Sequence, residues 1–430
     1  MTASNLRGDS KRITALIEAI ASISENPAPS GVTRLAYTSL ERDAHAAFTR
    51  WMTDLGLSVR TDEVGNTIAE RRGTRADPTG ETHKRAIGTG SHLDSVPRGG
   101  RFDGIAGVVA AAEVARLVVE QRIEHDHPLR FVVFAGEEGA RFGQACIGSK
   151  AVGGMWTSQA LAEVRDADGA SIADAMRALD FDPRQVDGAK WDRDDWAGFI
   201  ELHVEQGEVL EAQGTSIGIV DLISGSTRFE LTVSGRASHT GSTPMSLRAD
   251  ALCAAAEVVL LCEEIANDAR HRGTRCTVGK LAVLPGSITT IPGEVTLAVD
   301  VRDVDSGRQR ETANEVVSRG RDLCLRRGVE LTARLLSDAS PVVLPAWIRD
   351  ITTGVCKDLD VSYRVMDSGA SHDSQMVGHA VPAGMIFVPS RAGLSHVPEE
   401  WSSSSDIALG VEVLARSLLA VDAQLTRLGR

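Results

Sequence analysis

The hydrophobic pattern of this chain changes in kind along its length, and the change limits which folds the chain can adopt. Residues 131–134 form a continuously apolar run bounded by polar residues, which is typical of a strand buried on both faces of a helix-covered sheet. Between residues 226 and 336, apolar and polar residues alternate, as at Phe229, Leu231 and Val233. Alternation with a period of two indicates an antiparallel sheet with one buried and one exposed face. We therefore expect two different sheets, since 430 residues are too many for one ordinary core.

The alternating region has the pattern of a domain of its own. Its predicted elements are strand, helix, strand, strand, helix and strand, with the helices at residues 247–269 and 308–327. A βαββαβ order is typical of the ferredoxin-like fold. Buried-strand and helical patterns precede this region and return after it. We predict an α/β catalytic domain with a mixed, mostly parallel sheet, made of residues 1–221 and 337–430, and an inserted ferredoxin-like α+β domain at 222–336.

Composition argues against several classes of partner. A formal net charge of −13 does not suit a nucleic-acid-binding surface, which needs clustered Lys and Arg. No apolar run approaches the ~18 residues of a membrane span, and the N-terminus lacks the apolar segment of a secretory signal. The six cysteines are scattered without a C-x-x-C pair, which indicates reduced thiols rather than disulfides or a thiolate metal site. We expect a cytoplasmic protein in which any metal has nitrogen and oxygen ligands.

Five short segments place His or acidic residues next to small residues or at strand ends. Two of them directly follow predicted buried strands, and ligands of open α/β sheets bind beyond the carboxyl ends of the strands. We therefore expect the side chains of the five segments to converge. The segments are Ser91-His92-Leu93-Asp94, Arg101-Phe102-Asp103-Gly104, Gly136-Glu137-Glu138-Gly139, Glu201-Leu202-His203-Val204-Glu205-Gln206-Gly207 and Ser395-His396-Val397-Pro398.

Each segment also has an ordinary structural explanation. A lone His after a strand is usually a hydrogen-bonded structural residue, although Asp94 could orient His92 as carboxylates orient metal-bound imidazoles. Asp103 could simply cap the helix that follows it. Glu137 and Glu138 are adjacent carboxylates that repel each other unless a cation or a proton lies with them, and a solvated loop end is the alternative. The joint occurrence of the segments, rather than any single one, favours a metal site.

Taken together, the segments resemble the M20 metallopeptidase clan, and in particular its hydantoinase/carbamoylase branch. That branch includes N-carbamoyl-L-amino acid hydrolases, allantoate amidohydrolases and β-ureidopropionases. His203 stands where the peptidases of the clan usually have a carboxylate, which points to the amidohydrolase branch. The resemblance covers nearly the whole chain and is carried by Ser91-His92-Leu93-Asp94, Gly100-Arg101-Phe102-Asp103-Gly104, Glu137-Glu138-Gly139, Glu201-Leu202-His203-Val204-Glu205-Gln206-Gly207, Thr243-Pro244-Met245 and Ser395-His396-Val397-Pro398-Glu399.

The resemblance implies a pair of divalent metal ions. Asp103 would bridge them, His92 and His203 would complete one site, and Glu138 and His396 would complete the other. Imidazole and carboxylate ligands suit Zn, Mn, Co and Ni alike. The sequence therefore predicts two ions per subunit without choosing the metal.

The resemblance also implies roles in catalysis and substrate binding. Glu137 would be the general base, and Asp94 would orient His92. Gln206, His239 and Arg302 match positions that contact the substrate in the family, where the counterpart of His239 reaches across a dimer to polarise the scissile carbonyl. The guanidinium of Arg302 has a planar fork suited to a carboxylate. Its alternative is a surface ion pair with the neighbouring Asp300 or Asp303.

Two departures from the family pattern affect the substrate pocket and leave the metal ligands intact. Thr289 stands where the family usually has an Asn that contacts the substrate, so that one hydrogen-bond donor is shortened or absent. The family's Gly-Ala-Gly-His-Asp stretch begins here with Gly369 and has Ser371 at its third position. The added hydroxymethyl group lies in a loop that lines the pocket. Both changes leave the exact substrate open.

The resemblance predicts a homodimer that hydrolyses N-carbamoyl-L-α-amino acids to the amino acid, CO₂ and ammonia, with the inserted domain as lid and dimerisation domain. Alternatives in the same branch are allantoate, an N-carbamoyl-β-amino acid, or an N-acyl-amino acid or other small amide. An alternative of another class is a non-catalytic metal- or peptide-binding protein on this fold. The intact base Glu137 beside a full ligand set argues against that alternative.

Overall fold

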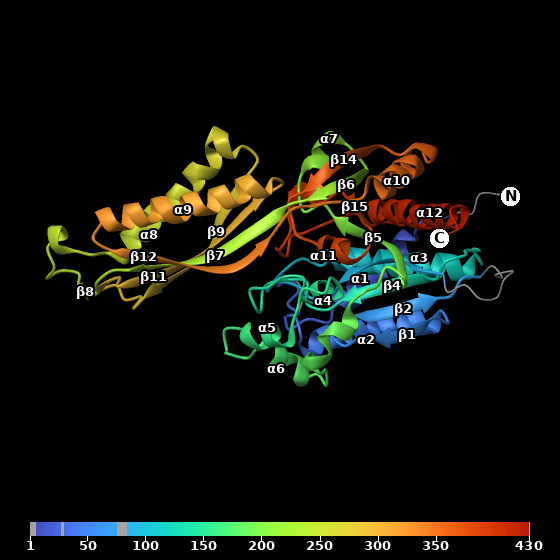
Figure 1. Ribbon diagram of the computed structural model, residues 1–430, viewed down its shortest axis with the longest axis horizontal. Helices are drawn as coiled ribbons and strands as arrows, with labels where there is room; N and C mark the ends of the chain where they lie inside the picture. The colour runs from blue at the N-terminus through green and yellow to red at the C-terminus, as the bar shows by residue number, and fades with distance from the viewer. Residues whose placement is uncertain (1–5, 27–29, 75–83, 430) are drawn as a thin grey trace. The chain divides into compact units, whose positions relative to one another are not determined.

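The structure, a computed structural model, describes residues 6–26, 30–74 and 84–429 and divides the chain into two units (Figure 1). The first unit comprises Met1–Asp221, Val343–Ser368 and His372–Arg430, and the second comprises Leu222–Val342 and Gly369–Ser371. The second boundary falls after Val342 rather than after residue 336, because strand β12 continues to Ala339. Each unit has its own apolar core.

The larger sheet has nine strands within the described residues, in the order β1-β2-β4-β3-β5-β15-β6-β13, with β14 also paired to β6. Its four central strands, β4, β3, β5 and β15, run parallel, whereas β1, β2 and β6 pair antiparallel. This arrangement confirms the predicted mixed, mostly parallel sheet. The strands are β1 (Ser58–Thr61), β2 (Thr67–Arg71), β3 (Ala86–His92), β4 (Leu129–Phe134), β5 (Trp196–Val204), β6 (Ile217–Ile223), β13 (Val342–Val343), β14 (Tyr363–Ser368) and β15 (Ala383–Val388).

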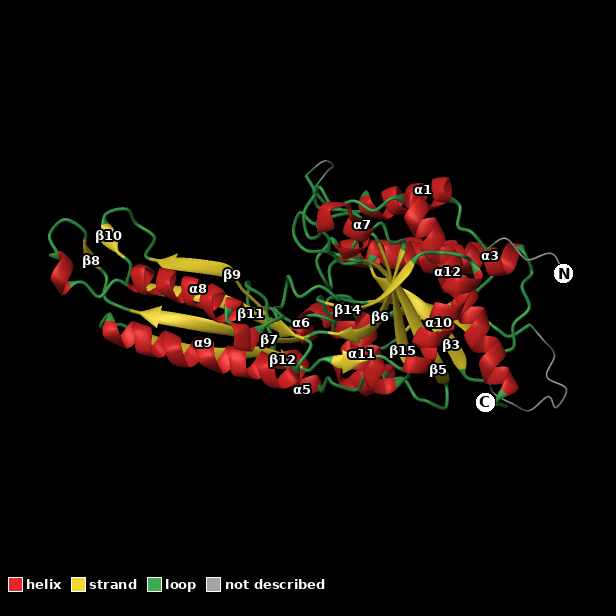
Figure 2. Ribbon diagram, turned by 90° about the horizontal axis from the view of Figure 1, so that it is seen from above, coloured by secondary structure: helices red, strands yellow, loops and turns green. Residues whose placement is uncertain are grey.

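Helices cover both faces of this sheet (Figure 2). Every residue of β3, β4, β5 and β15 is buried. The continuous apolar run at residues 131–134 predicted this for β4. Helices α3, α11 and α12 all pack against β5. The helices of the first unit are α1 (Ser10–Ala21), α2 (Ser39–Asp54), α3 (Ile105–Glu120), α4 (Ile147–Val152), α5 (Ser158–Glu163), α6 (Ile172–Arg177), α7 (Val209–Gln213), α10 (Ala346–Asp358), α11 (Asp373–Ala380) and α12 (Ser404–Arg427).

The start of α2 has a consequence for the centre of the first unit. Thr38 is the N-cap, and its hydroxyl accepts a hydrogen bond from the Glu41 backbone N–H, which satisfies one of the free donors of a helix start. The Glu41 carboxylate is fully buried and accepts hydrogen bonds from the backbone N–H groups of Tyr37 at 2.7 Å and Gly136 at 2.8 Å. Glu41 therefore ties the helix start to the turn that precedes Glu137.

The second unit has a four-stranded antiparallel sheet in the order β12-β7-β11-β9, and α8 and α9 cover one face of it (Figure 1). In β11, buried and half-buried residues alternate without interruption, as a sheet with one covered face requires. The apolar positions of the alternating pattern are the buried ones. The elements are β7 (Gly225–Ser234), β8 (Ser238–His239), α8 (Ala251–Asn267), β9 (Arg275–Leu284), β10 (Thr290–Ile291), β11 (Glu294–Asp303), α9 (Ser306–Arg326) and β12 (Glu330–Ala339).

Helix α8 begins four residues later than the predicted residue 247. The Asp250 side chain caps it by accepting hydrogen bonds from the backbone N–H groups of Leu252 and Cys253. Residues Met245–Leu247 form a separate 3₁₀ turn after Pro244. The apolar pattern of 247–269 thus identified the helix, and the capping aspartate within that range fixed its start.

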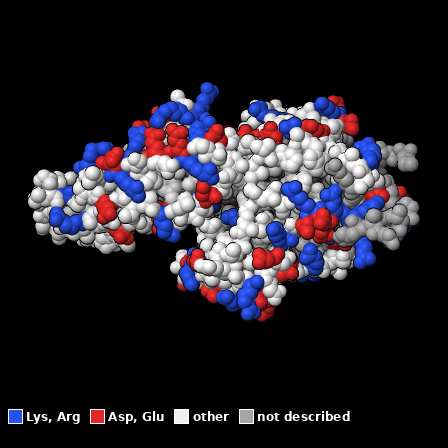
Figure 3. Space-filling model, viewed as in Figure 1, with Lys and Arg blue, Asp and Glu red and all other residues white. Residues whose placement is uncertain are grey.

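The visible surface mixes charges of both signs. On the face shown in Figure 3, Lys and Arg side chains are interspersed with Asp and Glu. No helix among the described residues is both long enough and apolar enough to cross a membrane.

Candidate metal centre

Side chains from three neighbouring strands meet at one edge of the larger sheet. His92 is the last residue of β3, Glu137 and Glu138 follow β4, and His203 is the last residue but one of β5. Since β3, β4 and β5 are adjacent and parallel, their carboxyl ends lie at the same edge. Asp103 lies just before α3, and the loop after β15 adds His396.

Asp103 is at the centre of this group. Its Oδ1 atom lies 3.2 Å from His203 Nε2 and 3.6 Å from His92 Nε2, while its Oδ2 atom lies 3.1 Å from His396 Nε2. Glu138 Oε1 lies 3.5 Å from the same His396 nitrogen. Two sets of potential ligands share Asp103, and within each set the ligand-type atoms lie within 4.8 Å of one another. The sets are His92, Asp103 and His203, and Asp103, Glu138 and His396. The structure thus brings all five predicted ligands together.

The buried imidazoles are oriented as nitrogen ligands. His203 Nδ1 lies 2.9 Å from the Val204 carbonyl oxygen, and His92 Nδ1 lies 3.2 Å from the Asp94 carbonyl oxygen. An imidazole that donates its Nδ1–H to a carbonyl presents the lone pair of Nε2 on its other side. The backbone N–H of Gly104 donates to His203 Nε2 at 3.2 Å, which is consistent with a lone pair on that atom.

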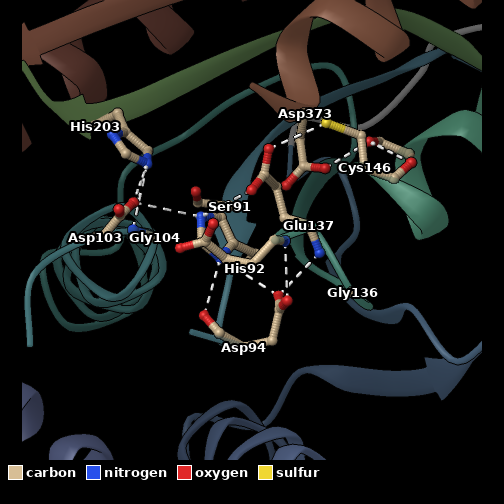
Figure 4. A network of polar contacts seen from close by, with 12 residues as sticks. Ser91, His92, Asp94, Asp103, Gly104, Gly136, Glu137, Cys146, His203 and Asp373 are labelled. Atoms are coloured by element: carbon tan, nitrogen blue, oxygen red, sulfur yellow. Dashed lines mark hydrogen bonds and ion pairs between the residues drawn. The ribbon is translucent and has the colours of Figure 1, made fainter. Parts of the chain in front are cut away.

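Asp94 connects the loops that follow β3 and β4. Its Oδ1 and Oδ2 atoms accept hydrogen bonds from the backbone N–H groups of Glu137 and Glu138, both at 2.9 Å, and Oδ1 lies 3.4 Å from His92 Nδ1 (Figure 4). One buried carboxylate therefore fixes the position of His92 and of both glutamates. The geometry agrees with the orienting role that the resemblance implies for Asp94.

The acidic residues of the group are buried, which changes their pKa values. Burial, and after it the charge of Asp103, raises the pKa of Glu138 to about 8. Burial likewise raises the pKa of Glu137. Burial also opposes ionisation of Asp103, but its close contacts with His203, His396 and His92 hold its pKa well below the usual value. Three carboxyl groups in so small a buried volume require protons or cations. The donor set therefore fits divalent metal ions.

Two structural alternatives for these residues are wrong. Asp103 does not cap α3, because Gly104 is the N-cap and that helix start has no side-chain capping hydrogen bond. Glu137 and Glu138 are not a solvated loop end, since each is only 7% exposed. A third set of potential ligands, Glu201, His203 and His372, overlaps the first. The Glu201 carboxylate already accepts hydrogen bonds from the Ser91 hydroxyl and the Ser374 backbone N–H.

The position of the His92 ring against the backbone requires glycine at position 104. Gly104 has φ +66°, a region that L side chains rarely adopt. A Cβ atom at this position would lie 2.5 Å from His92 Nε2 and Cε1. The close approach of backbone to imidazole therefore depends on the missing side chain.

Gln206 lies against the same group. Its Nε2 donates to Asp103 Oδ2 at 2.8 Å and to Ser395 Oγ at 3.1 Å. Its Oε1 is buried and has no hydrogen-bond partner among the described residues. The amide oxygen is therefore an acceptor at the metal centre that a further donor can use.

The other predicted substrate contacts belong to the second unit. His239 and Thr289 lie together where β8 pairs with β10, because Thr290 is opposite His239 and the Thr289 carbonyl accepts the Thr240 backbone N–H. Arg302 donates through Nη1 to the Gly369 carbonyl at 3.2 Å. Ser371 is half-buried and, with Gly369, belongs to this unit.

Arg302 also forms one of the ion pairs considered as its alternative. Its Nε donates to Asp300 Oδ2 at 2.9 Å. Asp303 is bound instead by Arg308 and by the hydroxyl of Thr274. Arg302 Nη2 has no hydrogen-bond partner within the described residues, so this one nitrogen of the guanidinium remains available to an acceptor.

Three residues to which the sequence analysis gave no role contact the centre. The Cys146 thiol donates to Glu137 Oε1 at 3.0 Å, and Ser395 and Glu400 contact Asp103. Ser395 and Glu400 flank the predicted ligand His396, which was a usable signal. Cys146 stands in a loop with no chemical pattern around it, and its contact depends on the turn that returns the chain to Glu137.

The chain is similar to several known proteins. The model of the peptidase family M20/M25/M40 matches residues 88–420. An N-carbamoyl-L-amino acid amidohydrolase from Geobacillus stearothermophilus is 40% identical over 89% of this chain and 92% of that protein. The allantoate amidohydrolase of Escherichia coli is 34% identical over 93% of this chain and 95% of that protein.

Solved structures agree with these relatives. The crystal structure of an amidase of the hydantoinase/carbamoylase family from Burkholderia vietnamiensis has a TM-score of 0.89 and 30% identity, over 97% of this chain and 98% of that chain. The similarity in sequence and the similarity in fold therefore point to the same family. This chain belongs to the peptidase family M20/M25/M40, in its hydantoinase/carbamoylase branch of amidohydrolases.

Proposed function

We propose that this amidohydrolase cleaves the carbamoyl C–N bond of N-carbamoyl-L-amino acids with water, giving the amino acid, CO₂ and ammonia. The observation that carries the proposal is the group of three imidazoles and the Glu138 carboxylate around Asp103, with the carboxylate of Glu137 beside it. The similarity to an N-carbamoyl-L-amino acid amidohydrolase, the higher of the two identities above, favours this substrate class.

Two divalent cations per subunit, Zn, Mn, Co or Ni, would be held by the two ligand sets that share Asp103. His92 and His203 would complete one site and Glu138 and His396 the other. Bound there, the cations would supply Lewis acidity, which lowers the pKa of water and polarises a carbonyl oxygen. The protein's part is to hold the ligands, to exclude competing protons and to move the reacting proton.

Glu137 is the group that would move the proton. Its Oε1 already accepts the Cys146 thiol, whereas its Oε2 lies 3.8 Å from His92 Nε2, on the side of the ligands. Oε2 is therefore the atom that would take a proton from water and deliver it to the leaving nitrogen. Burial raises the Glu137 pKa, which brings the group closer to the pH of its task and helps it to act both as base and as acid.

His239 is suited to stabilise negative charge on the substrate carbonyl oxygen. Its Nδ1 accepts hydrogen bonds from the backbone N–H groups of Gly241 at 3.0 Å and Ser242 at 3.1 Å. A ring nitrogen that accepts carries no proton, so Nε2 carries it and is a donor. The exposed ring thus offers one N–H, the group that an oxyanion needs.

Replacing His239 by Ala should lower kcat by about 10²–10³-fold, the usual cost of losing one oxyanion donor. Metal content should not change, because His239 is not in either ligand set. Steady-state kinetics and metal analysis of the purified variant measure both. Ile288→Ala is the control, since this side chain belongs to the same loop region and is 98% exposed. A His239→Ala enzyme with kcat within twofold of the parent would exclude the role.

Arg302 and Gly369 would bind the substrate carboxylate. Arg302 Nη2 would donate to the carboxylate, and the contacts of Nε with Asp300 and of Nη1 with the Gly369 carbonyl hold the guanidinium in place. Ser371 would shape the substrate pocket from the segment that contains Gly369, and Thr289 would contribute from the segment before β10. We also propose, from the family resemblance, that the second unit is the lid and dimerisation domain of a cytoplasmic homodimer.

Ammonia release should identify the substrate class. The protein is stripped of metal, reloaded separately with Mn, Co, Ni and Zn, and supplied with N-carbamoyl-L- and D-amino acids, N-carbamoyl-β-alanine, allantoate and N-acetyl-amino acids. Fast, metal-dependent release of ammonia and amine from the L-carbamoyl compounds alone is expected. The stripped protein should be inactive on all of them.

The other outcomes of this panel separate the alternatives. Turnover of allantoate or of the β-amino acid derivative in place of the L-carbamoyl compounds would support the same reaction on a different substrate. Release of amine from the acetyl compounds without release of ammonia would identify the enzyme as an N-acyl hydrolase. Metal binding with no hydrolysis of any amide would identify a non-catalytic binding protein.

A further inference from the structure

Glu400 is a buried carboxylate, 2% exposed, that no part of the proposed reaction uses. Its Oε1 accepts hydrogen bonds from the backbone N–H groups of Phe102 at 2.8 Å and Asp103 at 2.9 Å. Its Oε2 accepts the hydroxyl of Ser395 at 2.8 Å. Three donors and no acceptor are bound to it, so both carboxylate oxygens are in use. Glu400 therefore connects two segments of the first unit that are about 300 residues apart in sequence.

Both segments carry predicted metal ligands. On one side, Glu400 fixes the backbone of Asp103, the residue common to both ligand sets. On the other side, Ser395 directly precedes His396. The Ser395 hydroxyl has one proton and two acceptors, Glu400 Oε2 at 2.8 Å and Asp103 Oδ2 at 3.2 Å. The shorter contact, to Glu400, holds this serine.

His396 needs such support. Its side chain is 50% exposed, unlike the buried rings of His92 and His203. Its backbone has φ +60°, a conformation that is unfavourable for a non-glycine residue and persists only where the surroundings impose it. The neighbouring turn, in which the Glu400 backbone N–H donates to the Val397 carbonyl at 3.1 Å, is part of those surroundings.

We propose that Glu400 is a positioning residue that fixes the Asp103 and His396 segments to each other and so sets the geometry of the Asp103, Glu138 and His396 ligand set. The inference rests on the proposed function in that this set binds a divalent cation. It assigns no contact with substrate or metal to Glu400. Outer residues that hold metal ligands typically contribute 10–100-fold to metal affinity, and about this much is expected of Glu400.

Space around Glu400 is as restricted as its hydrogen bonding. A Cβ atom on Gly100 would lie 2.2 Å from Glu400 Cδ and Oε1, so the backbone of residue 100 closes one side of the carboxylate. A replacement side chain therefore has no second position from which to reach the same donors. Removal of the carboxylate leaves the N–H groups of Phe102 and Asp103 buried without an acceptor, which is costly.

The test compares Glu400→Ala, Glu400→Gln and Ser395→Ala with Glu399→Gln, a change at the neighbouring exposed glutamate. Metal-free full-length proteins are titrated with Co²⁺ against a competing chelator while the visible absorption of the ion is recorded. A glutamine keeps an oxygen for the two backbone donors and an amide that can donate to Ser395, but removes the charge. Alanine at position 400 removes all three hydrogen bonds. Ser395→Ala keeps the two backbone hydrogen bonds of Glu400 and removes the contacts of the Ser395 hydroxyl with Glu400, Asp103 Oδ2 and Gln206 Nε2.

We expect Glu400→Ala to weaken the Co²⁺ ion at the Asp103, Glu138 and His396 set by about 10–100-fold and to change the absorption spectrum. Ser395→Ala should weaken one of the two Co²⁺ equivalents and leave the other near its parent affinity. Glu400→Gln should lie closer to the parent than to alanine, and Glu399→Gln should match the parent. If Gln and Ala weaken binding equally, charge rather than positioning is responsible and the proposal is wrong.

The remaining outcomes also decide the question. Parent-like binding and spectra in Glu400→Ala would overturn the inference. If Glu400→Ala does not fold, parent-like binding of both equivalents in folded Ser395→Ala and Glu400→Gln would overturn it, and weakening in Ser395→Ala would support it. A parent protein that binds no Co²⁺ at all would overturn the metal centre of the proposed function, whereas the results above concern Glu400 alone.

Discussion

Replacing Glu137 by Gln is expected to lower kcat by at least 10²–10⁴-fold, the usual contribution of a general acid–base. The amide has nearly the volume of the carboxylate but cannot accept the proton of water. The Glu137 backbone N–H should remain bound to Asp94 Oδ1, since this contact does not involve the side chain. Both ligand sets should therefore still bind metal. Rapid-quench or steady-state assays on the metal-loaded variant give kcat, and metal analysis gives the ion content.

The two measurements together separate the roles of the adjacent glutamates. Loss of turnover with full metal content identifies Glu137 as the base. If the variant loses turnover and also loses one metal ion per subunit, Glu137 is a ligand. That result would contradict the assignment of Glu138 as the ligand beside His396. Turnover within tenfold of the parent would refute the mechanism proposed for Glu137.

The second large effect is expected from Gly104→Ala. The added Cβ would lie 2.5 Å from ring atoms of His92, so the imidazole, which is 2% exposed and has no free space, must move away from Asp103. We expect metal affinity at the His92, Asp103 and His203 set to fall by at least 10–100-fold, as for other disturbances of ligand orientation. Strain at φ +66° adds a loss of unfolding free energy of about 1 kcal/mol or more.

Gly143→Ala is a matched control for this change. Gly143 has φ +69°, close to that of Gly104, but a Cβ there would meet nothing within 4 Å. The two variants thus share the backbone strain and differ in the collision with His92. Chelator-competition titrations and thermal unfolding of both variants isolate the collision. Equal metal affinity in the two variants would show that His92 does not depend on Gly104.

The fold could be predicted from sequence to the extent that local patterns reflect burial. The apolar run at 131–134 and the alternation at Phe229, Leu231 and Val233 identified sheets of different kinds, because one is covered on both faces and the other on one face. The predicted start of α8 was wrong by four residues, since an apolar pattern does not reveal which of two candidate turns is capped. The order of strands in the larger sheet has no local signal.

The candidate site depends even more than the fold on contacts that local sequence patterns do not reveal. Local spacing left Asp103 open to a role as helix cap, and only the observed cap at Gly104 excludes it. The ligand sets came from the resemblance, whose motifs lie in separate segments. The contact of Glu400 with Phe102 and Asp103 joins residues about 300 positions apart, and no periodicity connects them. Such contacts are created by the tertiary fold, so they are visible only in it.

The place of β15 in the sheet has a consequence for the order in which the protein folds. This strand is the last in the chain, yet it lies between β5 and β6, so the larger sheet stays divided until synthesis has passed residue 388. Nearly all of the second unit is one continuous segment and has left the ribosome by then. The nascent chain therefore carries an unpaired edge of β5, a strand that is wholly buried in the folded protein, through that interval, and such edges attract other strands. A chain that stops before residue 383 lacks an inner strand of its main sheet rather than a dispensable tail.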